Sequence, residues 1–201
     1  MGTKILLATA NRGKIKEIKD ILEGLDLDIV TLDDYPGLSL PPEDGSTFRE
    51  NALIKARGAA SKTGVAVLAD DSGLEVDFLG GLPGIRSARY AGTGASDKEN
   101  WLKLLKELEG VPEEKRRARF RCALALVWPD GEEEVFEGSL DGVILGEPRG
   151  GHGFGYDPVF FIPGMGKTAA ELTPNEKNSV SHRAKALEKL KNRLENRYKK
   201  S

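Results

Sequence analysis

Short apolar runs alternate with amphipathic stretches in the first third of the chain, and this alternation limits the folds available to it. Residues 4–10 (KILLATA) and 65–69 (VAVLA) are short, almost wholly apolar runs of the kind found in buried strands. Residues 14–23 carry isoleucine and leucine at helical spacing, and residues 47–62 resume a helical pattern. The alternation predicts an α/β fold with a mixed sheet.

Pairs of polar residues mark where two helices should begin. Thr47 with Glu50, and Ser96 with Glu99, have the three-residue spacing of a capping box. The chain ends in a fourth helical stretch, also amphipathic, which predicts one helix from Ser181 to residue 201 with its leucines facing inward.

The remaining segments predict strands and loops. Residues 120–128 and 134–136, joined by the turn PDG, are typical of a hairpin, and residues 143–145 suggest a further strand. Residues 29–44 and 79–94 are rich in turn-forming residues and are expected to be irregular. No repeat or linker interrupts the chain, so we expect a single domain over residues 1–201.

Composition excludes several classes of protein. Hydrophobic residues make up 39% and charged residues 31% of the 201 residues, as in ordinary globular domains. The net charge of −2 argues against a protein that coats nucleic acid, and no apolar run approaches the roughly 20 residues that span a bilayer. Cys122 is the sole cysteine, so no intrachain disulfide can form, which suits a reducing compartment. With no secretory signal recognised, we expect a cytoplasmic protein that binds neither nucleic acid nor membrane.

The turn at residues 9–14 (TANRGK) is a candidate phosphate site. It joins a predicted strand to a predicted helix, and a helix N-terminus presents free backbone N–H groups and a positive dipole end. Its small residues let a phosphate approach, while Asn11 and Lys14 add donors and charge. The alternative is a plain connection with solvated basic residues.

A pair of carboxylates, Asp70 and Asp71, follows the second predicted strand. Carboxylates at strand ends commonly hold Mg²⁺, which prefers oxygen ligands and usually keeps several waters. Glu43, in an irregular stretch, is a candidate for an additional carboxylate ligand. The alternative is an acidic turn held by hydrogen bonds between side chains and backbone.

Glycines crowd around aromatic residues at 150–158 (GGHGFGYDP). Such a loop allows the backbone to approach a ligand closely and offers an aromatic ring that can stack on a base. The competing interpretation places Phe154 and Tyr156 in the core, which is the commoner fate of aromatic residues.

Polar residues cluster again before the last helix, at 177–183. Ser181, His182 and Arg183 could together bind an anion or the acceptor edge of a base. Alternatively, Ser181 caps a helix and His182 lies on the surface. Two histidines and no cysteine pair argue strongly against a zinc site.

Two further features are interpreted as unrelated to function. Residues 164–168 (GMGKT) resemble the end of a P-loop, but the pattern requires glycine at position 161, where this chain has Phe161. The basic residues of the last helix are interrupted by Glu188 and Glu195, which indicates a solvated helix face rather than a nucleic-acid-binding arm.

Taken together, the chain resembles the inosine triphosphate pyrophosphatase family, also called non-standard purine NTP pyrophosphatases. The matching segments are ATANRGK (8–14) with Glu17, TFRENALIKA (47–56), ADDSGLEVDFLGGLPGIRSARYAG (69–92), GGHGFGYDPVFF (150–161), KTAAEL (167–172) and NEKNSVSHRAKAL (175–187). They occur in the family's order and span nearly the whole chain. The resemblance implies a Maf/inosine triphosphate pyrophosphatase-like α/β fold, in which an elongated, curved mixed sheet flanked by helices forms two lobes with a nucleotide cleft between them. It also implies a homodimer.

The resemblance further implies hydrolysis of ITP, dITP and XTP to the monophosphate and pyrophosphate with Mg²⁺. Asp71 would be the catalytic acid–base residue, and Glu43 and Asp71 would bind the metal. The implied substrate-binding residues are Thr9, Ala10, Asn11, Arg12, Gly13, Lys14, Ser72, Phe154, Gly155, Tyr156, Asp157, Lys177, His182 and Arg183. The alternatives are a pyrophosphatase of the same scaffold that prefers pyrimidine or modified nucleotides, and a nucleotide sensor without turnover.

Overall fold

The computed structural model describes residues 3–198 and divides into two compact units. Unit 1 contains the residues up to Asp71, Cys122–Gly138 and those from Arg183 onward. Unit 2 contains Ser72–Arg121 and Ser139–His182. Two units agree with the two lobes expected, while the single domain over residues 1–201 and the nucleotide cleft stay predictions.

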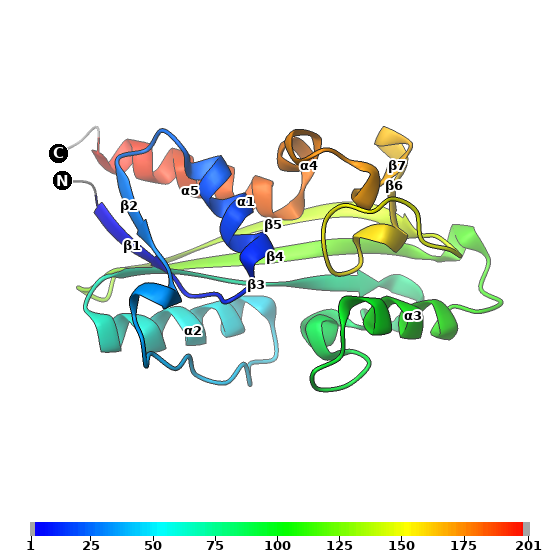
Figure 1. Cartoon of the computed structure of the whole chain (residues 1–201), viewed down its shortest axis with the longest axis horizontal. Helices are drawn as coiled ribbons and strands as arrows, with labels where there is room; N and C mark the ends of the chain where they lie inside the picture. The colour runs from blue at the N-terminus through cyan, green and yellow to red at the C-terminus, as the bar shows by residue number, and fades with distance from the viewer. Residues whose placement is uncertain (1–2, 199–201) are drawn as a thin grey trace. The chain divides into compact units, whose positions relative to one another are not determined.

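Strands form a mixed sheet, as predicted (Figure 1). Within the described residues they are β1 (Thr3–Leu7), β2 (Leu27–Val30), β3 (Ala66–Val76), β4 (Arg117–Val127), β5 (Glu133–Ile144), β6 (Phe160–Ile162) and β7 (Lys167–Thr168), and their order in the sheet is β2-β1-β3-β4-β5-β6-β7. Strand β1 pairs in parallel with β2 and β3, whereas β6 pairs antiparallel with β5 and β7. Strands β3, β4 and β5 contribute residues to both units.

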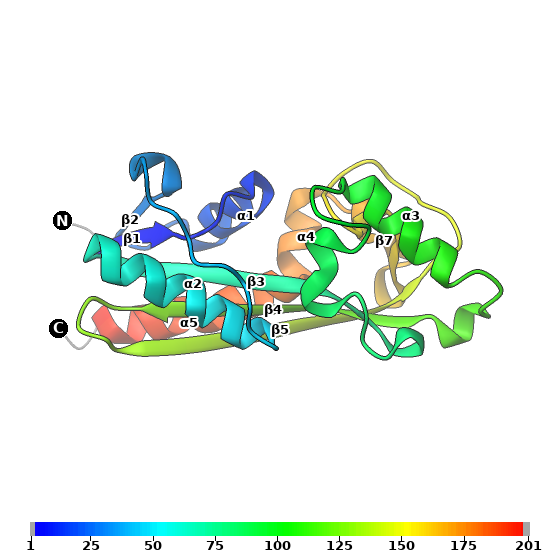
Figure 2. The ribbon, with the colours of Figure 1, turned by 90° about the horizontal axis from the view of Figure 1, so that it is seen from below.

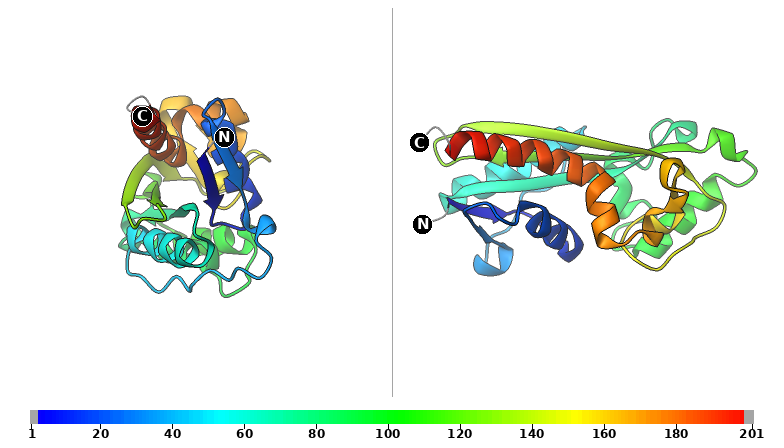
Figure 3. Two further views of the ribbon diagram at one scale, coloured as in Figure 1. Left: turned by 90° about the vertical axis from the view of Figure 1, so that its left-hand side faces the viewer. Right: turned by 90° about the horizontal axis from the view of Figure 1, so that it is seen from above.

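Unit 1 has helices on both faces of its strands. Helices α1 (Arg12–Leu22) and α5 (His182–Tyr198) cover one face, and α2 (Phe48–Thr63) covers the other, as the left panel of Figure 3 shows. Because side chains alternate along a strand, every second residue faces α1 and α5. Those residues form one buried cluster with apolar residues of the two helices. The strands contribute Ile5, Leu7, Leu68, Leu124 and Leu126, and the helices contribute Ile18, Leu22, Leu187, Leu190 and Leu194.

Helix α2 lies along β3 (Figures 1 and 2), and several of its alanines are buried. Ala52, Ala56 and Ala59 are completely buried. Small side chains at helical spacing explain why this helix can lie close to the strands. Thr47 caps it as predicted, since its hydroxyl accepts the Glu50 N–H.

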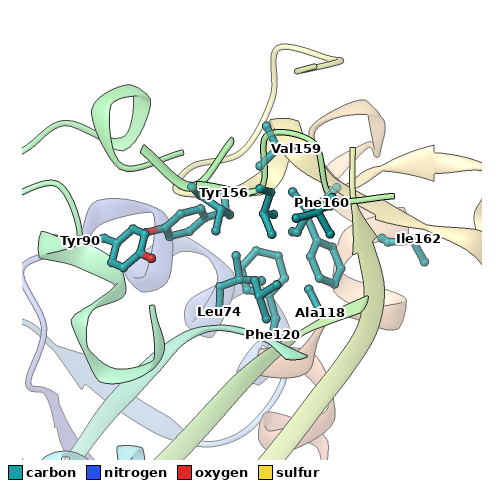
Figure 4. Packing of buried hydrophobic residues seen from close by; sticks show 14 of the residues in the cluster. Leu74, Tyr90, Ala118, Phe120, Tyr156, Val159, Phe160 and Ile162 are labelled. Carbon is teal, nitrogen blue, oxygen red and sulfur yellow. The ribbon is translucent and has the colours of Figure 1, made fainter. Parts of the chain in front are cut away.

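Unit 2 holds a second buried cluster around aromatic side chains. Its longer helices are α3 (Asp97–Glu107) and α4 (Pro174–Val180). Figure 4 shows Leu74 and Phe120 beside Phe160 and Tyr156, and the rings of Phe120 and Phe160 lie 4.3 Å apart between centroids.

Short 3-10 helices occur in both units. They are Leu32–Asp34, Asp77–Leu79, Gly84–Arg89, Glu113–Lys115, Asp157–Val159, Pro163–Met165 and Ala169–Glu171.

Cys122 lies in β4, inside the apolar cluster of unit 1. Burial raises the pKa of its thiol to about 12. Within residues 3–198, none of the helices combines the length and apolar character needed to cross a bilayer.

The structure corrects two expectations about elements and confirms a third. Strand β3 does not end before Asp70 but continues to Val76. Residues 143–145 do not begin a new strand, because Val143 and Ile144 are the end of β5. The predicted last helix is confirmed as α5, which begins at His182, one residue after the predicted start; Ser181 has an extended backbone and separates it from α4, which ends at Val180. The predicted continuation to residues 199–201 lies outside the described residues.

Candidate active site

The predicted phosphate turn joins β1 to α1 in unit 1. Asn11 caps the helix, because its side chain accepts the Lys14 N–H at 3.0 Å, and its own N–H is held by the Thr9 hydroxyl at 3.2 Å. Ala10, Asn11 and Arg12 are exposed. The first turn of α1 therefore begins at the surface, and a helix N-terminus there is suited to an anionic group.

Asp70 and Asp71 point to opposite faces of the strand, because β3 continues through both residues. Asp70 faces α1 and α5. Its Oδ2 atom lies 3.0 Å from the Lys14 Nζ atom and 3.3 Å from the Arg183 Nη2 atom. The expectation of an acidic pair at a strand end is therefore wrong, and the two carboxylates have separate surroundings.

Asp70 is a buried anion with cationic neighbours. Burial opposes its charge, but Lys14, Arg183 and Lys55 more than offset this and hold the pKa of Asp70 well below its ordinary value. Arg183 also donates to Glu17, and the charges of Asp70 and Glu17 raise its pKa although the side chain is buried. Asp70 is thus a poor proton acceptor and a strong anchor for two cations.

Asp71 faces α2, where its surroundings are different. Burial raises the pKa of Asp71; the negative charge of Glu43 adds to this and Lys55 opposes it. The Lys55 Nζ atom donates to the Glu43 Oε1 atom at 2.7 Å and to the Asp70 carbonyl oxygen at 2.5 Å. A buried carboxylate with a raised pKa is the better general base of the two.

Glu43 and Asp71 fit a magnesium site. Lys55 forms an ion pair with Glu43, and the negative charge of Glu43 contributes to the raised pKa of Asp71. A protein commonly binds Mg²⁺ through one or two carboxylates, with water and substrate phosphates completing the shell. In residues 3–198 no group of three or more His, Cys, Asp or Glu side chains is arranged for a metal ion, and Asp44 is exposed. Of the two acidic residues at 43–44, the geometry favours Glu43.

In unit 2, Asp157 organises the glycine-rich loop. Its Oδ2 atom accepts the Phe154 N–H at 2.9 Å and the Lys177 ammonium at 2.6 Å. The Lys177 Nζ atom lies 4.5 Å from the centroid of the half-buried Phe154 ring. Asp157 thus holds an aromatic face and a cation together, which is a suitable arrangement for a flat ligand that carries hydrogen-bond acceptors.

Other predicted residues of unit 2 are buried or half-buried. Tyr156 is buried and its hydroxyl donates to the Ser87 carbonyl oxygen at 2.8 Å. His182 is buried and stacks on Phe120, with ring centroids 4.9 Å apart. Gly155 donates its N–H to Asp97, and Ser72 is half-buried on β3. Contact of these residues with a substrate stays a prediction.

Two residues without a predicted role, Lys55 and Glu17, contact the predicted site residues. Lys55 lies on α2 between Ala52 and Ala56, so a charged residue stands on the face that these alanines bury. A lysine at a core position of an amphipathic helix is the signal that marks it, because a buried charge requires partners. Glu17, one turn after Lys14, receives Arg183.

Comparisons with known proteins identify the family of this chain. Residues 5–193 match the Ham1 family. The chain is 54% identical to a protein of Geobacter sulfurreducens named dITP/XTP pyrophosphatase, over 96% of each chain, and 53% identical to a protein of that name from Bacillus licheniformis, over 93% and 95%.

Solved structures match as well. A HAM1 protein from Coxiella burnetii has a TM-score of 0.89 at 43% identity, covering 96% of this chain and 99% of that one. A Mycobacterium abscessus structure titled nucleoside-triphosphatase / dITP/XTP pyrophosphatase has a TM-score of 0.77 at 48% identity, covering 94% and 98%. Since the match includes all but the ends of the chain, the resemblance inferred from the motifs is confirmed, and this protein belongs to the Ham1 family.

Proposed function

We propose that this protein hydrolyses the non-standard purine nucleotides ITP, dITP and XTP to the nucleoside monophosphate and pyrophosphate. Relatives that share more than half of its residues over nearly the full length are named dITP/XTP pyrophosphatase. The structural observation that carries the proposal is buried Asp71, whose raised pKa suits a general base, beside Glu43 and Lys55.

The bond that breaks joins the α- and β-phosphates. Asp71 accepts a proton from the water that attacks the α-phosphorus in line with the departing pyrophosphate. Backbone N–H groups at the start of α1 bind phosphate oxygens and stabilise the charge that develops on the leaving group. Lys14, held by Asp70, adds a positive charge near that helix turn.

Glu43 and Asp71 would hold Mg²⁺. When bound, the ion neutralises phosphate charge and helps to position the leaving group. Lys55 supports this arrangement, because its ammonium group is hydrogen-bonded to the Glu43 carboxylate.

Base selection is assigned to unit 2. Inosine and xanthosine present an oxygen acceptor at position 6, where adenosine presents an amino donor. Donors such as Lys177 and His182 would pair with the oxygen, and the Phe154 ring would stack on the base. Leaving adenine's amine against donors costs about 1–3 kcal/mol, which gives tenfold or more in selectivity. The role of Arg183 in reading the base, implied by the resemblance, stays a prediction.

We also propose a cytoplasmic homodimer. A lone buried cysteine suits a reducing compartment, and the resemblance to the pyrophosphatase family supplies the dimer.

The proposal is tested by pyrophosphate release from ITP, dITP, XTP, GTP, ATP and UTP, with Mg²⁺ and with EDTA. We expect metal-dependent release that favours ITP, dITP and XTP. Activity confined to UTP would favour a pyrimidine enzyme on the same scaffold. ITP that binds but persists would identify a sensor, and release of single phosphates would exclude attack at the α-phosphorus.

A further inference from the structure

Two helices of this protein begin with the same local arrangement. Residues 47–51 (TFREN) start α2, and residues 96–100 (SDKEN) start α3. In each, the first residue is the N-cap and accepts a hydrogen bond from the backbone N–H of the glutamate three residues on. Asn51 and Asn100 follow at equivalent positions, and both are buried.

The carbonyl oxygens of the two asparagine side chains each accept a hydrogen bond from a backbone N–H of the preceding loop. Asn51 Oδ1 accepts the Gly45 N–H at 2.8 Å, and Asn100 Oδ1 accepts the Ala91 N–H at 2.8 Å. Each oxygen thus ties the preceding loop to the first turn of its helix. With the oxygen fixed, the direction of the amide NH₂ group is fixed too.

The side-chain NH₂ groups of Asn51 and Asn100 differ in their hydrogen bonding. Asn100 Nδ2 donates to the Ala88 carbonyl oxygen at 3.2 Å, so this asparagine is satisfied at both ends. Asn51 Nδ2 is fully buried and has no well-formed hydrogen bond to any group in residues 3–198. Because buried donors are almost always paired, the exception calls for an explanation.

The position of Asn51 near Asp71 explains why its NH₂ group is unpaired among the described residues. The pKa of Asp71 is raised mainly by burial, and Asn51 acts in the opposite direction as a nearby donor. The NH₂ group therefore lies close to the Asp71 carboxylate without a well-formed hydrogen bond to it. Hydrogen bonds of a catalytic site are often long before substrate binds and shorten in the reactive complex.

We propose that Asn51 is a positioning residue of the active site, whose oxygen holds the loop that carries Glu43 and whose NH₂ group orients the Asp71 carboxylate when substrate is bound. The inference rests on the proposed function. Asn100 performs the first task alone, whereas Asn51 performs both.

Gly45 shows how closely the loop fits Asn51. A Cβ atom on Gly45 would lie 2.8 Å from Asn51 Oδ1 and 2.8 Å from the Glu50 Cβ atom. Neighbouring Ser46 is also tied down, since its N–H donates to Glu50 Oε2 at 2.7 Å. Glu43 stands two residues before Gly45. By binding the Gly45 N–H, the Asn51 oxygen therefore fixes the stretch of backbone that sets the position of Glu43.

The test compares Asn51→Asp with Asn100→Asp. Each aspartate keeps an oxygen for the loop N–H and removes the NH₂ donor. We measure kcat and KM for ITP at saturating Mg²⁺, together with the thermal midpoint. For Asn51→Asp we expect kcat to fall about tenfold to a hundredfold with KM within about twofold, because a donor to a charged group is lost while nucleotide contacts remain. For Asn100→Asp we expect a lower thermal midpoint and unchanged kcat.

A second variant covers the case in which Asn51→Asp does not fold. Asn51→Ser is small and adds no charge, and we expect it to lower kcat in the same direction. In the wild type, the side-chain NH₂ resonances of Asn51 should shift when Mg²⁺ and an α,β-methylene analogue of ITP are added, whereas those of Asn100 should not.

The outcomes separate this inference from the proposed function. Wild-type kcat in both Asn51 variants, or an unmoved Asn51 resonance while the wild type turns over ITP, would overturn the role of Asn51 alone. A wild-type protein that releases no pyrophosphate from any purine nucleotide would overturn the function itself.

Discussion

At the residue scale, Asp70 and Asp71 show how neighbours of identical chemistry acquire opposite properties. They point to opposite faces of β3: at Asp70 the charges of Lys14 and Arg183 outweigh the effect of burial, whereas at Asp71 burial prevails over the opposing charge of Lys55. The sequence could indicate that this pair matters but not which member does what. The deciding partners come from distant positions in the chain, and only the fold brings them together.

Asp71→Asn and Asp70→Asn should therefore fail in different ways. We expect Asp71→Asn to keep nucleotide binding and the wild-type free energy of unfolding, while kcat falls about 10²–10⁴-fold because the general base is lost. We expect Asp70→Asn to lower the free energy of unfolding by about 3–5 kcal/mol, because buried Arg183 and half-buried Lys14 both lose the Asp70 carboxylate. Urea denaturation and ITP turnover measure the two effects. Equal loss of stability in both variants would contradict the assignment.

The pH dependence of this pair has a defined sign. The folded pKa of Asp70 is below its ordinary value of 3.8, so its stabilisation is fully present above pH 3.8 and is lost progressively as the pH falls from there toward the folded pKa. The stability difference between the wild type and Asp70→Asn should therefore narrow below about pH 4. The pKa of Asp71 is raised above its ordinary value of 3.8. On acidification, the midpoint of the fall in turnover should therefore lie above pH 3.8.

At the element scale, sequence patterns predicted most helices and strands, and the misses have physical causes. The end of β3 was placed too early, because two adjacent aspartates are costly in a buried strand unless ion pairs stabilise them, and those ion pairs come from other elements. Helix α4 was missed although Thr173 and Glu176 form a capping box with proline at the first helical position. Only seven residues long, it lacks a visible apolar period.

The loop of residues 153–157 offers a test at this scale. Gly153 has φ +82°, and a Cβ atom there would collide with the Asp157 carboxylate, which holds Phe154 and Lys177. Gly153→Ala should therefore raise KM for ITP about tenfold or more, because small displacements of positioning groups are costly.

Gly151→Ala is the matched control in the same loop. A methyl group added at Gly151 would meet no atom within 4 Å, and the φ angle of this residue is not positive, so wild-type KM is expected. Equal kinetics in both alanine variants would show that the loop conformation does not affect substrate binding.

At the scale of the whole molecule, the order of strands was beyond the reach of periodicity. Local patterns did not reveal that β1 lies between β2 and β3, or that the last helix packs in the same cluster as the first. These pairings depend on contacts between distant segments. The resemblance to a family supplied the fold where local patterns could not.

Homodimer formation is the prediction that belongs to this scale. Sedimentation equilibrium should give twice the chain mass of 21.8 kDa at micromolar concentration. A mass of one chain throughout would remove the dimer from the proposal and leave the assignment of the site residues intact.

The buried thiol of Cys122 has a practical consequence. With a pKa near 12, it is almost entirely protonated at neutral pH, and its place in β4 shields it from reagents. A thiol-reactive dye can reach it only when the strands of unit 1 separate. The chain thus contains a single internal reporter, whose rate of labelling measures how often unit 1 opens, without any engineered probe.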